Sequence, residues 1–171
     1  MQLLFDELCL RLDAAPPLAL VVSIAQQRLG LFRGGALAAD WPVSTSRFGT
    51  GSQLNSYKTP LGLHRIAEKI GADMPLNTVF KGRKPVDRSK LELLRPAQDL
   101  IMSRILWLDG CERGLNRGGD MDSHDRYIYI HGTTHEDRIG TPDSHGCVRM
   151  RNADVVALFD LVEVGTPVFI G

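Results

Sequence analysis

The chain has 171 residues and carries 20 Lys and Arg against 20 Asp and Glu, so its formal net charge at pH 7 is zero. This length suits one domain with a substantial core. A content of 43% hydrophobic and 23% charged residues is typical of a globular protein. Because the one basic cluster is Lys81–Lys84, we expect neither nucleic-acid binding nor membrane attachment through basic residues.

Residues 1–17 predict a short helical extension ahead of the main domain at 18–171. Leu4, Leu8 and Leu12 recur every four residues, as on one face of an amphipathic helix. Asp6 and Glu7 interrupt the apolar stretch that an export signal needs. No run approaches the roughly 18 apolar residues of a membrane span. We therefore expect a cytoplasmic protein, with a periplasmic location as the alternative if a leader is missing from this sequence.

The rest of the chain predicts a mainly β domain with a few helices. Apolar runs and alternating patterns favour a hairpin at 18–24 and 28–34, then strands at 36–45, 63–69, 99–110, 125–132 and 165–171. A short helix is expected near 88–95. A second helix is expected at 152–162, with Asn152 as its N-cap and an apolar stripe that begins at Val155.

Two segments, YIYIHG (127–132) and SHGCVRM (144–150), hold the reactive side chains. His131 precedes Cys147 by 16 residues of polar and turn-forming sequence, which lets the two face each other across a cleft. An ordinary thiol, with a pKa of about 8.5, is mostly protonated at neutral pH. An imidazole that takes its proton, or a helix beginning just after it, would activate Cys147. The Gly146 and Cys147 amides could then stabilise an oxyanion.

Other interpretations of these residues stay open at this point. Cys147 could be a packed core thiol, as we expect of Cys9 and Cys111, whose wide spacing suggests no disulfide framework. Arg149 and Asp154 could form a helix-end ion pair, and Tyr127 and Tyr129 could be ordinary strand residues. A zinc site could draw on His124, His131, His135, His145 and Cys147. The residues alone indicate a Cys–His hydrolase or acyltransferase without a named substrate.

The stretch IHGTTHEDRIGTPDSHGCVRM (130–150) resembles the signature of the L,D-transpeptidase (YkuD-like) catalytic domain, an HG pair followed by S-H-G-C-V/I-R-M/L. Upstream, GTGSQLNSYKTPLGLHRI (49–66) is similar to the family's S/T-x-G…TPxG segment. The resemblance covers residues 18–171. It implies a β-sandwich-like fold with the cysteine in a cleft, and it implies no cofactor or metal.

The resemblance also implies roles for individual residues. Cys147 would attack the bond before the terminal D-alanine of a peptidoglycan stem tetrapeptide and form a thioester. His131 would be the base, with its imidazole held by the Gly132 carbonyl. Ser144, His145 and Gly146 would shape the site and the oxyanion hole. Arg149 and Tyr129 are the candidate substrate-binding residues.

The acceptor of the acyl group defines the final expectation. Water would give an L,D-carboxypeptidase, and an amine would give an L,D-transpeptidase. With no leader in this sequence, we expect a cytoplasmic L,D-carboxypeptidase that trims recycled muropeptides, with segment 68–126 capping the cleft. The alternatives are an exported transpeptidase that forms cross-links or exchanges D-amino acids, and a non-catalytic zinc-holding or peptidoglycan-sensing module.

Overall fold

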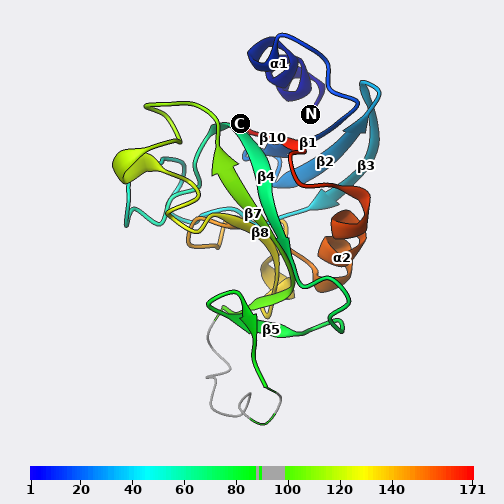
Figure 1. Cartoon of the computed structure of the whole chain (residues 1–171), viewed down its shortest axis with the longest axis vertical. Helices are drawn as coiled ribbons and strands as arrows, with labels where there is room; N and C mark the ends of the chain where they lie inside the picture. The colour runs from blue at the N-terminus through cyan, green and yellow to red at the C-terminus, as the bar shows by residue number, and fades with distance from the viewer. Residues whose placement is uncertain (88, 90–98) are drawn as a thin grey trace.

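The computed structural model of the chain describes residues 1–87, 89 and 99–171 (Figure 1). The short helix expected near 88–95 falls almost wholly outside these ranges. The described elements are α1 (Gln2–Leu12), β1 (Leu18–Ser23), β2 (Arg28–Arg33), β3 (Ala36–Pro42), β4 (Gly62–Ile70), β5 (Val79–Lys81), β6 (Lys84–Pro85), β7 (Ile101–Gly110), η2 (Gly119–Met121), β8 (Tyr129–Thr133), η3 (Glu136–Arg138), β9 (Val148–Met150), α2 (Asn152–Leu161) and β10 (Pro167–Ile170).

The ten described strands form one sheet, ordered β3-β2-β1-β10-β4-β7-β5-β6, with β8 on β7 and β9 on β8. The β1–β2 hairpin is antiparallel, as expected, whereas β1–β10 and β8–β9 are parallel pairs. A mainly β fold is therefore confirmed. No helix in the described ranges has both the length and the apolar character needed to cross a membrane.

The continuous apolar run of β1 is explained by burial of both faces of the strand. Leu20 and Val22 point into the main core, which also contains Leu158 and Phe159 of α2. Ala19 and Val21 point to the other face, where α1 covers them. Because successive strand residues alternate between faces, a strand covered on both sides is apolar at nearly every position.

The N-terminal helix α1 packs on the outer face of the sheet, against β1 and β10 at one end of the molecule (Figure 1). Phe5 and Leu8 are its buried residues, and the Phe5 ring stacks on Phe32 of β2 with centroids 4.3 Å apart. The helix expected within residues 1–17 is therefore present, with Leu8 at the centre of its packed face.

Strand β7 separates the main core from a second cluster on its opposite face. Leu106 and Leu108 belong to the core, whereas Ile105 and Trp107 join a cluster that contains Phe80 and Tyr129 and borders Cys147. This second face is where the candidate catalytic residues lie.

The structure corrects three local expectations. Residues 148–150 form strand β9, so Cys147 precedes a strand, and α2 begins only at Asn152. The N-cap of α2 is Arg151, and Asn152 is the first helical residue. Strand β8 begins at Tyr129 instead of residue 125, because Tyr127 has a left-handed backbone with φ 57°, which ends the extended pattern.

Candidate active site

The predicted Cys–His pair lines one pocket of about 170 Å³, formed by Asp99, Ile101, His131, Ser144, His145 and Cys147. Strand pairing brings the two groups together. β8 runs parallel to β9 and pairs His131 with Arg149, two residues beyond Cys147. The 16-residue separation in sequence is thus closed by adjacent strands.

The Cys147 thiol is held against the segment that leads into β8. Sγ accepts a hydrogen bond from the Tyr129 N–H at 3.4 Å and donates to the Tyr127 carbonyl at 3.4 Å. Burial raises the pKa of the thiol to about 11, against a lowering by the Tyr129 N–H. Activation by a helix that begins just after the cysteine was a wrong expectation, because β9 stands there.

The His131 imidazole is buried, and its orientation is set by the next residue. Nδ1 donates to the Gly132 carbonyl at 2.6 Å, the contact that the family resemblance implied. This bond places the proton on Nδ1 and leaves Nε2 as the acceptor. Burial lowers the pKa of His131, with Asp99 opposing and Arg149 reinforcing that shift. The imidazole is therefore neutral at pH 7.

Position 132 requires glycine because the Asn152 side chain of α2 leaves no room for a Cβ atom there. A Cβ there would lie 2.2 Å from Asn152 Oδ1 and 2.7 Å from the Met102 carbonyl oxygen. Asn152 is fixed in this place, since its Oδ1 accepts from Ser103 Oγ at 2.8 Å and its Nδ2 donates to the Thr133 carbonyl at 2.9 Å. Asn152 thus braces β8 instead of capping α2.

The Ser144–Cys147 turn is closed by its own serine. Ser144 Oγ donates to the Cys147 carbonyl at 2.6 Å and accepts from the Gly146 N–H at 3.2 Å. Gly146 has φ 121°, a conformation that glycine alone adopts readily. Thr59, from the upstream TPxG segment, donates to the Gly146 carbonyl at 3.0 Å. Because Ser144 already occupies the Gly146 N–H, the expectation that this amide serves the oxyanion is not supported.

His145 lies on the exposed side of the turn. Its Nε2 accepts a hydrogen bond from Arg47 at 2.8 Å, and its ring contacts those of Phe48 and Tyr57, with centroids 5.7 and 5.9 Å away. Its supporting role in the site stays a prediction.

Arg149 is buried, with 1% of its side chain exposed, and both of its terminal Nη nitrogens bind protein oxygens, whereas its Nε has no hydrogen-bond partner among the described residues. It donates to Asp99 Oδ2, Asp143 Oδ2 and Ser44 Oγ, each at 2.9 Å. A buried cation needs such partners, so we reassign Arg149 from substrate binding to positioning. The sequence analysis missed Asp99 and Asp143, because isolated aspartates before a strand and in a turn carry no distinguishing signal.

Tyr129, the other candidate substrate-binding residue, is buried beside the thiol. Its hydroxyl accepts a 3.4 Å hydrogen bond from Arg83, in the turn between β5 and β6. Burial raises the pKa of Tyr129, so the phenol stays protonated at neutral pH. Its contact with substrate stays a prediction.

Within the described ranges, no three or more His, Cys, Asp or Glu residues gather in a way that could hold a metal ion. Among the zinc candidates, His124 stacks on Trp107 with centroids 4.0 Å apart, and His131 Nδ1 is bound to a carbonyl.

Fold and site together define a β-rich domain that presents a neutral Cys–His pair in a pocket, and the comparisons place it in a family. A family model described as the L,D-transpeptidase catalytic domain matches residues 17–170. "Putative L,D-transpeptidase YqjB" of Bacillus subtilis (strain 168) is 48% identical over 54 residues, 31% of this chain and 31% of that protein. "Probable L,D-transpeptidase YbiS" of Escherichia coli (strain K12) is 54% identical over 43 residues, 25% of this chain and 14% of that protein.

Solved structures share the fold. L,D-transpeptidase 3 from Mycobacterium tuberculosis aligns with a TM-score of 0.56 at 17% identity, over 92% of this chain and 62% of that chain. An L,D-transpeptidase from Mycobacterium smegmatis aligns with a TM-score of 0.53 at 16% identity, over 92% and 60%. The chain thus spans less than two thirds of these relatives. It belongs to the L,D-transpeptidase catalytic domain family.

Proposed function

We propose that this protein cleaves the L,D bond before the terminal D-alanine of peptidoglycan stem tetrapeptides, as a cytoplasmic L,D-carboxypeptidase that acts on recycled muropeptides. The observation that carries the proposal is the pocket shared by Cys147 and His131. Its histidine donates Nδ1–H to Gly132 and keeps Nε2 available as a base.

The reaction starts from neutral groups. His131 Nε2 takes the Sγ proton as Cys147 attacks the carbonyl carbon of the L-centre, and the carbonyl π electrons move to oxygen. The Cys147 N–H is the backbone donor that we assign to this oxyanion. When the intermediate collapses, the C–N bond breaks, His131 returns the proton to the leaving amine, and a thioester remains. Water, deprotonated by His131, then releases the tripeptide and restores the thiol.

Hydrolysis and transpeptidation share the same first half-reaction, which forms the thioester. We therefore base the choice of water as acceptor on the cellular compartment in which the enzyme acts. The three cysteines of the described ranges are free thiols, which suits a reducing compartment. In the cytoplasm the enzyme would meet soluble recycled fragments and not the assembled wall. Part of segment 68–126 also lies beside the thiol, since Met74 and Phe80 join the cluster that Cys147 borders, and this supports its role as a cap.

The alternative is an L,D-transpeptidase that forms cross-links or exchanges D-amino acids in the periplasm. The relatives from Bacillus subtilis and Escherichia coli are named as L,D-transpeptidases, which favours this reaction for those proteins. A longer native reading frame and an amine acceptor would support it here.

The test is mass spectrometry of a soluble disaccharide tetrapeptide incubated with the enzyme, with and without an added D-amino acid. Loss of D-alanine to give only tripeptide, even with the amine present, supports the carboxypeptidase, whereas an exchange product or a dimer supports the transpeptidase. Cys147→Ala should abolish turnover. Cys111→Ala is the matched control, because Cys111 packs in the cluster beneath α1, and equal loss in both variants would contradict the assignment.

A further inference from the structure

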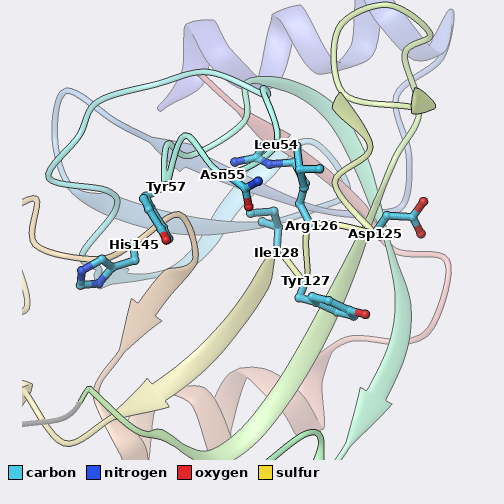
Figure 2. A pocket seen from close by; sticks show the side chains of 8 residues that line it. All are labelled: Leu54, Asn55, Tyr57, Asp125, Arg126, Tyr127, Ile128 and His145. Carbon is cyan, nitrogen blue, oxygen red and sulfur yellow. The ribbon is translucent and has the colours of Figure 1, made fainter. Parts of the chain in front are cut away.

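A second pocket has a volume of about 200 Å³, and Figure 2 shows the side chains that line it. It is lined by Leu54, Asn55, Tyr57, Asp125, Arg126, Tyr127, Ile128 and His145. The two pockets share His145. The thiol also connects them, since Cys147 Sγ donates to the carbonyl oxygen of Tyr127, which lines the second pocket. A peptide whose scissile carbonyl is at Cys147 can therefore extend into this second space.

Arg126 brings a positive charge to the second pocket without a carboxylate to balance it. The side chain is partly buried, and its Nη atoms donate to the carbonyls of Lys58 at 2.7 Å and Gly51 at 3.4 Å, and to Ser56 Oγ at 3.5 Å. In the described part of the chain, no Asp or Glu oxygen lies within 4.0 Å of its guanidinium nitrogens. Carbonyl partners satisfy donors but leave the charge itself unpaired.

The one acidic residue that lines this pocket does not serve Arg126. Asp125 is exposed and its carboxylate is 3.8 Å from His124 Nδ1. Figure 2 shows it directed away from the other labelled side chains. Burial lowers the pKa of Arg126, and the negative charge of a Cys147 thiolate would oppose that shift.

The walls of this pocket are also conformationally unusual. Tyr57 and Tyr127 have φ values of 58° and 57°, in the left-handed region that bulky residues avoid, whereas Asn55, at 62°, is of a type that adopts this region more readily. Such strain is concentrated at sites that hold ligands. The Arg126 hydrogen bonds to Gly51, Ser56 and Lys58 hold the strained loop in place.

We propose that the second pocket receives the terminal D-amino acid of the substrate and that Arg126 binds its free carboxylate. This inference rests on the proposed function and deepens it. Arg126 would thereby restrict cleavage to the last residue of a peptide. A chain that continues beyond the D-residue, or ends in an amide, presents no carboxylate at this position for Arg126 to bind. A guanidinium that binds a carboxylate makes a strong, charge-assisted hydrogen bond.

The test compares kcat/KM for two soluble tetrapeptides that differ only in a free or amidated C-terminus. The wild-type enzyme should prefer the free acid by about 10- to 100-fold. Arg126→Gln should reduce this ratio toward one by lowering the rate on the acid, chiefly through KM. Arg126→Lys should retain part of the preference, because it keeps the charge. Arg33→Gln, at an exposed arginine at the end of β2, should keep the wild-type ratio.

The outcomes separate the two proposals. If the wild-type enzyme cleaves both peptides equally well, the Arg126 inference is overturned and the proposed function stands. If Arg126→Gln and Arg126→Lys slow both peptides by the same factor, Arg126 only supports the loop and the inference is likewise overturned. If the wild-type enzyme cleaves neither peptide, the proposed function fails and takes the inference with it.

Discussion

At the scale of single residues, the candidate catalytic pair, Cys147 and His131, is uncharged at neutral pH. Burial raises the pKa of Cys147 to about 11 and lowers that of His131. A preformed thiolate–imidazolium pair would require the opposite shifts. In the proposed mechanism the thiol proton is therefore transferred only as the substrate is attacked, and Nε2 of His131, which lines the same pocket, is the acceptor.

The first prediction concerns the alkylation of Cys147 by iodoacetamide in the free protein. With a pKa of about 11, only about one thiol in 10⁴ is ionised at pH 7, and that fraction rises tenfold per pH unit. The alkylation rate of the Cys147 peptide, followed by mass spectrometry, should therefore climb with unit slope from pH 7 to pH 10. A plateau below pH 9 would show that the thiol is activated before substrate arrives.

A second prediction concerns Arg149, whose charge balances Asp99 beside His131. Arg149 lowers the pKa of His131 and Asp99 raises it, so removing the arginine exposes the imidazole to an unpaired carboxylate. Arg149→Met should shift the acidic limb of the kcat/KM profile to higher pH. It should also lower the free energy of unfolding by up to about 3 kcal/mol.

The control for that change is Arg151→Met, at an exposed arginine two residues further on, which should leave both the profile and the stability close to wild type. A stability loss in Arg149→Met with no shift of the acidic limb would restrict Arg149 to a structural role.

At the scale of elements, long hydrophobic patterns predicted helices and strands correctly, whereas short segments gave no usable pattern. The apolar β1 run and the periodicity of α2 predicted their elements because each repeats over several residues. Strand β9 has only three residues, too few for alternation to appear. Asn152 resembled an N-cap in sequence, yet its amide is needed by Ser103 and Thr133, partners that only the tertiary structure brings together.

The third prediction tests α1 as a packed element. Leu8 is fully buried and Leu3 is 83% exposed on the same helix. Leu8→Ala should lower the free energy of unfolding by about 2–5 kcal/mol, and Leu3→Ala should change it by less than about 0.5 kcal/mol. Urea denaturation measures both. Similar small effects would mean that α1 does not pack on the sheet in solution.

At the scale of the whole molecule, the site depends on segments far apart in sequence. Thr59 holds the Gly146 carbonyl, and Arg149 connects Ser44, Asp99 and Asp143. The family motif places Cys147 and His131, since it is local and ordered. It contains nothing about Asp99 and Asn152, whose contacts with the site come from strand pairing, or about Arg126, whose proposed role rests on its contacts with the loop at 51–58.

The last prediction concerns stability against pH and the buried His64 of β4. Its Nδ1 donates to the Gly62 carbonyl and its Nε2 accepts from Ser123 Oγ, both at 3.0 Å, so the folded protein holds it neutral. Burial lowers its pKa to about 4, against about 6.5 in the unfolded chain. Between these values the unfolded state binds the extra proton, so stability is intact above pH 6.5 and falls as pH drops toward 4.

For His64 alone, the full loss of stability amounts to about 3 kcal/mol. Most of this loss should appear as a difference between the free energies of unfolding measured by urea denaturation at pH 7 and at pH 4.5. In His64→Gln the difference between the two pH values should shrink by about that amount. Part of the dependence should remain, because His131 also has a lowered pKa and acts in the same direction. An equal pH dependence in variant and wild type would mean that His64 is already charged in the folded protein, or solvated well enough to take up its proton there.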